Sequence, residues 1–242
     1  MRVRTVGLVV AMSAEARSLT GRVQPLEQVV RIAEHAYLRV GGVGASAAER
    51  SCAALVEAGA SALVSAGCAA GLAPECRPGA LVVPAEVRSA QGEVFSADAE
   101  WRVALVAAAG LRISPLVGAV VSVDRVIGSV EKSALHASTG AIAADMESAA
   151  VAREAQRLGL PMISVRVVSD GMDDEFPNSL LDAIDAFGRP RLRPLVNAIV
   201  QNPGDAAVLM RSRTGFKKAC STLSLLAANV GPTFCCPGTT DG

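Results

Sequence analysis

The sequence predicts a three-layer α/β fold, in which helices flank a central sheet that is mixed but mostly parallel. Continuous apolar runs at residues 3–11, 62–66 and 162–168 are typical of strands that are buried on both faces. Helical patterns alternate with these runs, and that alternation favours a parallel sheet. The chain has 242 residues, of which 51% are apolar and 19% charged. It can therefore bury the core of one large domain or of two small ones.

The elements of the first third follow from apolar runs and turn residues. After the first strand, Ser13 can cap a short helix. Residues 29–32 and 36–40 are expected to pair as a hairpin, and the glycine-rich turn at 41–44 leads into a helix at 45–58. The N–H groups of such a turn can bind an anion. Close packing explains glycines more often, and GGVG is not a complete dinucleotide-binding fingerprint.

Small residues follow the apolar run at 62–66, with Gly67, Cys68 and Gly71 among them. Small side chains at a strand end leave the backbone accessible to a ligand, and a close contact between strand and helix requires them equally. Further strands are expected at 81–83, near Val87 and at 116–123, and further helices at 98–109 and 129–137.

Residues 140–170 predict one β-α-β unit. A first apolar run ends just before Asp145, a helical pattern continues to Leu158, and a second apolar run ends just before Asp170. Parallel strands joined by a right-handed crossover end at the same sheet edge, so Glu147 and Asp170 should converge there. This edge is the candidate site.

Each of these carboxylates also has a purely structural explanation. Glu147 could simply favour the positive end of its helix, and Asp170 could be the first polar residue of a loop. Both carboxylates are expected at one edge, with Met146 and Arg166 at similar depths. Together they favour a site.

The C-terminal part is expected to add helices at 179–187 and 192–201, and one at 205–229 that is interrupted at Gly215. The predicted organisation is a domain at 1–202 followed by a helical extension and flexible tail at 203–242. Four basic residues gather in the last helix beside Leu209 and Phe216: Arg211, Arg213, Lys217 and Lys218. They describe either a surface helix whose charged ends reach water, or a basic amphipathic element that contacts lipid or a partner.

Charge and cysteine content exclude several classes of protein. Lys plus Arg equals Asp plus Glu at 23 each, so no overall positive field attracts nucleic acid.

The six cysteines form no CxxC pair, and the acidic loop at 171–177 lacks calcium-loop spacing, so no metal or organic cofactor is expected. The apolar run after Arg2 and Arg4 is too short for a signal peptide and meets no cleavage site. No run of about 18 apolar residues suggests a membrane span, and the expected location is the cytoplasm.

Six ordered segments resemble the nucleoside phosphorylase and nucleosidase superfamily, and within it the 5′-methylthioadenosine/S-adenosylhomocysteine nucleosidases. Among them are GLVVAMSAEAR, SAGCAAGL and ADMESAAVA. The segments cover residues 7–17, 41–44, 65–72, 120–129, 144–152 and 165–170. The AEAR sequence and the added C-terminal helix look most like the hopanoid-biosynthesis-associated branch of phosphorylases. That branch implies adenosylhopane, with its lipid-like 5′ substituent, as the substrate.

The resemblance implies a role for each site residue. Asp170 matches the acid that protonates the purine at N7, and it would need to hold a proton, which burial beside other carboxylates would favour. Glu147 matches the carboxylate that accepts hydrogen bonds from the ribose hydroxyls. Met146 would pack against the sugar, and Ile127 would present backbone groups to the adenine edge. Val126 stands where the nucleosidases stack a phenylalanine on the base.

The identity of the nucleophile stays open between water and phosphate. Glu15 resembles the water-activating glutamate of the nucleosidases, and a carboxylate repels phosphate, which slightly favours hydrolysis. Arg166 matches an arginine on the nucleophile side that could serve either chemistry. Cys68 replaces a serine of the nucleosidases, so a good hydroxyl donor is lost.

Other classes remain alternatives. A methylthioadenosine/S-adenosylhomocysteine nucleosidase would use the same residues on another 5′ substituent. A non-catalytic nucleoside-binding protein of the same fold would tolerate Asp170→Asn. A Rossmann oxidoreductase would need a fuller glycine fingerprint. The resemblance also implies a homo-oligomer.

Overall fold

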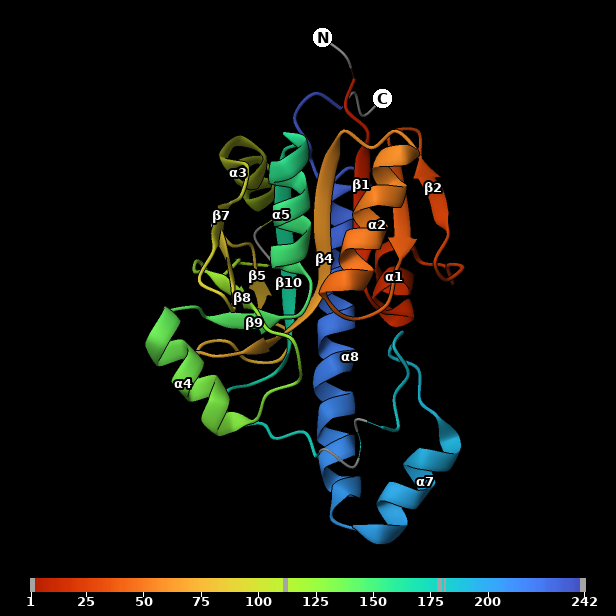
Figure 1. Ribbon diagram of the computed structural model, residues 1–242, viewed down its shortest axis with the longest axis vertical. Coiled ribbons are helices and arrows are strands. Elements are labelled where there is room, and N and C mark those ends of the chain that lie inside the picture. Colours follow the sequence, from red (N-terminus) through yellow and green to blue (C-terminus); the bar gives the residue numbers. More distant parts are fainter. Residues whose placement is uncertain (1–2, 111–112, 178–179, 181, 240–242) are drawn as a thin grey trace.

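The computed structural model describes residues 3–110, 113–177, 180 and 182–239. Figure 1 shows a central sheet with α2 (Ala45–Glu57) and α5 (Ser148–Leu158) on one face. The other face is covered by three helices, which share one apolar core with the strands: α1 (Ser13–Thr20), α3 (Ala99–Ala108) and α8 (Asp205–Val230). The predicted α/β fold, with a mixed sheet flanked by helices, is confirmed.

The sheet combines two parallel groups of strands. Its order is β2-β3-β1-β4-β9-β8-β6-β7, and β10 pairs with β4 and with β5. One parallel group consists of β3, β1, β4 and β10. The other parallel group consists of β6, β8 and β9. The two groups are joined by the antiparallel pairing of β4 with β9. The strand bounds are Val6–Val10 (β1), Val29–Ala33 (β2), Ala36–Val40 (β3), Ala62–Gly71 (β4), Leu81–Val82 (β5), Glu86–Ser89 (β6), Val94–Ser96 (β7), Val120–Ser122 (β8), Ala143–Asp145 (β9) and Met162–Asp170 (β10).

Most predicted elements are present, with shifted ends. The hairpin forms as β2 and β3. β4 continues through the small residues to Gly71, because β9 pairs with Ala70 and Gly71 and extends the ladder. The remaining helices are α4 (Ser129–Thr139) and α7 (Leu192–Gln201).

The helix predicted at 179–187 is wrong over residues 182–187, while Ser179 and Leu181 lie outside the described residues. Turns occupy this stretch, and Ile184 bridges Pro190. The carboxylate of Asp185 accepts the N–H groups of Phe187 and Arg189. An aspartate that accepts backbone N–H groups two and four residues ahead favours a turn over a helix.

α8 runs without a break through Gly215, contrary to the predicted interruption. The glycine lies where the helix crosses β10, and a Cβ there would meet the carbonyl oxygen of Ser169 at 2.1 Å. Gly215 therefore permits a close helix–strand approach.

Replacing Gly215 with alanine is expected to destabilise the protein by about 1–3 kcal/mol. Alanine favours a helix by about 1 kcal/mol, but the added methyl group would force α8 away from β10. Urea unfolding of Gly215→Ala measures the change. Gly204→Ala, where a Cβ meets nothing within 4 Å, is the matched control. Equal stability of the two variants would contradict this account.

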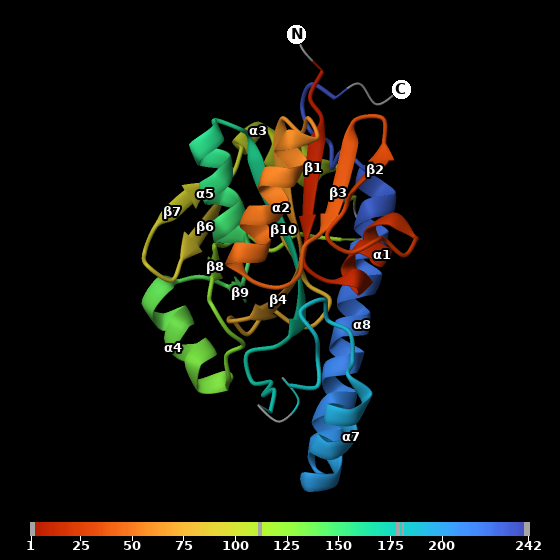
Figure 2. The ribbon, with the colours of Figure 1, turned by 45° about the vertical axis from the view of Figure 1, so that its right-hand side comes forward.

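The C-terminal segment packs against the body of the protein. Leu223, Leu226 and Phe234 belong to the main apolar core, and the indole Nε1 of Trp101 donates to the carbonyl oxygen of Phe234 at 2.7 Å. Figure 2 shows the second half of α8 beside the sheet and its first half extending past it, toward α7. The division of the chain at 202/203 stays a prediction. Among the described residues, none of the helices is long and apolar enough to cross a membrane.

Candidate active site

The candidate site lies where β4, β9 and β10 meet. Asp170 of β10 is in register with Ala70 of β4, which is in register with Ala144 of β9. Neighbouring strands are about 4.8 Å apart, so the backbones at Asp170 and Ala144 are about 10 Å apart. Glu147 follows three residues after Ala144. The structure thus brings Glu147 and Asp170 to the same part of the sheet. The predicted β-α-β unit of parallel strands is wrong, because β10 runs parallel to β4 whereas β9 runs antiparallel to it.

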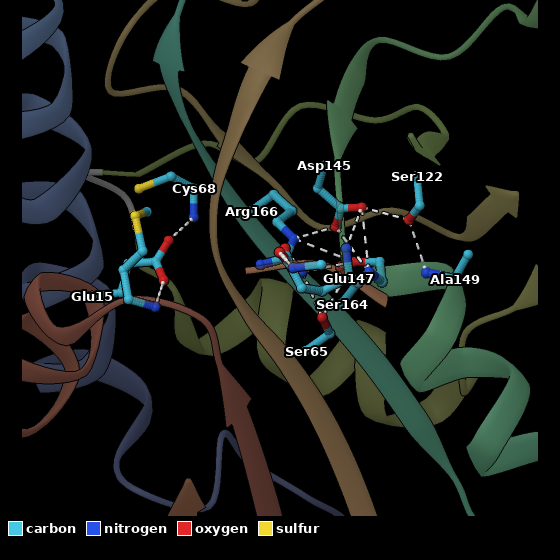
Figure 3. A network of polar contacts seen from close by, with 12 residues as sticks. Glu15, Ser65, Cys68, Ser122, Asp145, Glu147, Ala149, Ser164 and Arg166 are labelled. Atoms are coloured by element: carbon cyan, nitrogen blue, oxygen red, sulfur yellow. Dashed lines mark hydrogen bonds and ion pairs between the residues drawn. The ribbon is translucent and has the colours of Figure 1, made fainter. Parts of the chain in front are cut away.

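Arg166 is the centre of a buried polar network (Figure 3). Its Nε donates to Asp145 Oδ2 at 2.5 Å, and its Nη2 donates to Ser65 Oγ at 2.6 Å. Ser148 Oγ also accepts from Nε and Nη2, and Glu147 Oε2 lies 3.7 Å from Nη2. The planar guanidinium of Arg166 therefore binds both Asp145 at the end of β9 and Ser148 at the start of α5, and fixes their relative positions.

Glu147 is buried at the N-terminus of α5. Its Oε1 accepts the N–H of Gly44 at 2.9 Å, so the glycine-rich turn does bind an anionic group, and that group is a side chain of the protein itself. Burial raises the pKa of Glu147 to about 7; Arg166 opposes this shift and Asp145 adds to it. The contacts with Gly44 and Arg166 fix the position of this side chain at the start of α5.

The raised pKa of Glu147 predicts a pH-dependent stability. The native state keeps a proton that the unfolded chain loses near pH 4.5, so stability should fall as pH rises from 4.5 to about 7. Relative to Glu147→Gln, the wild type should lose up to about 3 kcal/mol over this window. Urea unfolding of both proteins across the window measures it. Parallel pH curves would contradict the assignment.

Glu15 is the second buried carboxylate, at 2% exposure. Its Oε1 accepts the N–H of Cys68 at 2.7 Å and its Oε2 accepts the N–H of Met12 at 2.9 Å (Figure 3). Burial raises its pKa, while the Cys68 N–H and Arg166 oppose the shift. A carboxylate with a raised pKa is a better proton acceptor.

Gly67 separates Glu15 from Arg166. A Cβ at this position would lie 2.6 Å from Arg166 Nη1 and 2.7 Å from Glu15 Oε1. The glycine in the small-residue segment is therefore required by the two charged side chains that pass it.

The site holds an excess of negative charge. Three buried carboxylates, on Glu15, Asp145 and Glu147, surround the single guanidinium of Arg166. Burial alone would lower the pKa of Arg166, but the carboxylates outweigh burial and raise it. One cation cannot neutralise three ionised carboxylates, which is consistent with the raised pKa values of Glu147 and Glu15. A ligand that carries positive charge would favour their ionised forms.

Asp170 belongs to a second charged cluster with Lys132 of α4. The Lys132 side chain is only 1% exposed, and its Nζ lies 2.7 Å from Asp170 Oδ2. It also donates to the carbonyl oxygens of Gly171 and Asp174, each at 2.8 Å, and Ser169 Oγ donates to Asp170 Oδ1. The expected burial of Asp170 beside other carboxylates is wrong, because its partner is an ammonium group and its side chain is 34% exposed.

The remaining predicted residues differ in their exposure. Ile127 is buried with Leu72 and Ala144, whereas Val126 is 44% exposed. Met146 is half-buried between Asp145 and Glu147. Burial and the nearby Glu15 raise the pKa of the Cys68 thiol well above its usual value, so this thiol is a poor nucleophile.

The acidic loop after Asp170 is tied to the protein. Glu175 Oε1 accepts the N–H of Ser129 at the start of α4, and Asp174 Oδ2 accepts the N–H of Gly171. Over the described part of the chain, no group of three or more His, Cys, Asp or Glu side chains could hold a metal ion. The loop positions α4, and with it Lys132.

The fold is that of an α/β protein, and its candidate site is a cluster of buried carboxylates around Arg166 near the ends of β9 and β10. Residues 5–189 match the Phosphorylase superfamily, and the chain belongs to that family. No curated protein matches the sequence.

Solved structures share the fold at low sequence identity. The 5′-methylthioadenosine/S-adenosylhomocysteine nucleosidase of Neisseria meningitidis, in complex with methylthio-immucillin-A, has a TM-score of 0.70 and 19% identity, over 96% of this chain and 100% of that one. Futalosine hydrolase of Helicobacter pylori has a TM-score of 0.69 and 15% identity, over 94% and 97%. The Colwellia psychrerythraea nucleosidase with adenine has a TM-score of 0.65 and 18% identity, over 97% and 95%.

Proposed function

We propose that this protein cleaves the N-glycosidic bond of a 5′-substituted adenosine and releases adenine, with water as the nucleophile at the anomeric carbon. The observation that carries the proposal is the excess of buried carboxylates around Arg166. Cleavage of this bond leaves cationic character on the sugar, and an anionic site stabilises that charge most in the transition state.

Glu147 and Glu15 act on the sugar and on the attacking water. Glu147, positioned by Gly44 and Arg166, accepts hydrogen bonds from the two ribose hydroxyls. Glu15 removes a proton from the attacking water, which its raised pKa favours. Met146 packs against the sugar.

The base side belongs to Asp170 and Lys132. The departing adenine gains negative charge and needs a proton at N7. Asp170 delivers that proton after receiving it from the Lys132 ammonium, which lies 2.7 Å away. The pair is left as a neutral amine and a carboxylate, and solvent restores the proton after adenine leaves. Ile127 and Val126 flank the base, so its contacts there are aliphatic.

The choice of water over phosphate rests on charge. A phosphate dianion beside Glu15 and Glu147 would be repelled, and only Arg166 would oppose that repulsion. Phosphate as co-substrate remains the competing proposal, because the family includes phosphorylases in its name.

The 5′ substituent that we propose is the large apolar body of adenosylhopane, which the AEAR segment and the C-terminal helix suggest. Methylthioadenosine and S-adenosylhomocysteine are the competing substrates, since similar folds with those names exist. We further propose that the protein acts in the cytoplasm as a homo-oligomer and needs no cofactor.

Adenine release from several 5′-substituted adenosines, with and without phosphate, tests the proposal. Release without phosphate is expected, and fastest from the substrate with the largest apolar substituent. Strict dependence on phosphate would reverse the choice of nucleophile. Equal turnover of methylthioadenosine and adenosylhopane analogues would remove the apolar specificity, and no release from any purine nucleoside would favour a non-catalytic binding protein.

A further inference from the structure

The end of the molecule opposite the chain termini carries an unusual surface, here called the helical tip: residues 189–218, which contain α7 and the first half of α8. Figures 1 and 2 both show these helices extending past the sheet, away from the ends marked N and C. The tip belongs neither to the sheet nor to the buried Arg166 network.

α7 exposes an apolar stripe. Leu192, Val196 and Val200 are 75%, 58% and 73% exposed, and their spacing of four residues places them on one face of the helix. Met210 of α8 is 62% exposed. Single exposed apolar side chains are common, but a continuous stripe on a ten-residue helix marks an interaction surface.

The same tip concentrates positive charge. The whole chain has no net charge, yet residues 189–218 hold seven basic residues and one acidic residue, Asp205. The rest of the chain is correspondingly acidic. All seven basic side chains are exposed: Arg189, Arg191, Arg193, Arg211, Arg213, Lys217 and Lys218. Of these, Arg189 is paired with Asp185.

The apolar stripe and the positive charge together favour one class of binding partner over others. A nucleic acid would pair with the cations but leave the apolar stripe in water. A second copy of this chain would bring two positive surfaces together in a symmetric contact, which like charges oppose. An anionic bilayer satisfies both features, since its head groups attract arginine and lysine while valine and leucine enter the boundary with the acyl chains.

We propose that the helical tip docks on the surface of membranes that contain anionic phospholipid, with the Leu192–Val196–Val200 stripe inserted and the basic residues on the head groups. This docking does not depend on the proposed reaction. It does place a further feature near the bilayer: an open cavity of about 360 Å³ is lined by Met210 and Arg211 of the tip and by Asp170. A substrate with an apolar 5′ substituent could thus approach the site from the membrane.

Co-sedimentation of the full-length protein with vesicles tests the proposal. Vesicles of phosphatidylcholine with added phosphatidylglycerol should bind the protein, added salt should weaken binding, and phosphatidylcholine alone should bind at least about tenfold more weakly. V196D/V200D and R213E/K217E should each lower binding to the mixed vesicles by at least about tenfold; Arg213 and Lys217 are exposed and do not line the cavity.

V23D/V103D is the matched control, because it adds the same two charges at exposed valines outside the tip. It should bind as the wild type does. All variants should release adenine from water-soluble methylthioadenosine at the wild-type rate, so a failure of docking is distinct from a failure of the proposed reaction. Since the altered side chains are exposed, circular dichroism should show an unchanged fold.

Three results would overturn the proposal. The first is no binding to the mixed vesicles, or equal binding by V196D/V200D and V23D/V103D. The second is a dimer in sedimentation velocity that V196D/V200D abolishes while vesicles are ignored, which would make the stripe a contact between copies. The third is binding of duplex DNA by both the wild type and V196D/V200D, together with competition in which DNA prevents binding to vesicles.

Discussion

Replacing Asp170 with asparagine is expected to lower kcat for adenine release by about 10²- to 10⁴-fold, the usual contribution of a positioned acid. Asparagine keeps the shape of the side chain but cannot deliver a proton to the departing purine. It also removes the anionic partner of the buried Lys132 ammonium, so some loss of stability is expected. Steady-state adenine release and urea unfolding measure the two effects.

A change of leaving group separates proton delivery from a structural role. Nitrophenyl riboside releases a stable phenolate that needs no proton, so Asp170→Asn should slow its cleavage by less than about tenfold. Lys132→Met should show the same split, with a large loss on the purine substrate and a small one on the nitrophenyl riboside. Asp173→Asn, at an exposed carboxylate in the same loop, is the matched control. Equal losses on both substrates would show that the Asp170–Lys132 pair only maintains the structure.

Replacing Glu15 with glutamine is expected to lower kcat for hydrolysis by about 10²- to 10⁴-fold, because the attacking water loses its proton acceptor. Both Glu15 oxygens accept backbone N–H groups, so the amide NH₂ of glutamine would face a donor, at a cost in stability of about 1–3 kcal/mol. Adenine release and urea unfolding again provide the measurements.

The Glu15 variant also tests the nucleophile. Removing this negative charge weakens the repulsion of phosphate, so phosphate should stimulate Glu15→Gln and leave the wild type unchanged. Glu57→Gln, at an exposed glutamate, should behave as the wild type in every assay. A wild type that is inactive without phosphate would show that Glu15 does not activate water.

The strands and most helices could be predicted from local pattern. The runs at 62–66 and 162–168 are apolar without alternation, and both became strands buried on two faces. The stretch 182–187 was mistaken for helix because the turn depends on Asp185 accepting N–H groups from residues two and four positions ahead. Helical spacing of apolar residues does not reveal such a side-chain contact.

The site was predicted unevenly. Asp145 stands at a strand end, as Asp170 does, and that position was the signal that could have identified it as a partner of Arg166. Lys132 carried no such signal, since it occupies a mostly polar helix and resembles a surface lysine in sequence. Its burial depends on the loop from Gly171 to Asp174 folding over it.

The sequence alone was sufficient to predict the layered α/β fold and the strand ends near which Glu147 and Asp170 lie, since apolar runs and the polar residues that end them are local properties. The tertiary structure decided that β9 and β10 run in opposite directions on either side of β4. Tertiary structure alone decided the charge around each carboxylate. Glu147 lies among buried anions with one arginine, whereas Asp170 lies against a buried lysine from a helix 38 residues earlier. Electrostatic energy depends on distances through space between groups far apart in the chain, and residue spacing does not encode those distances.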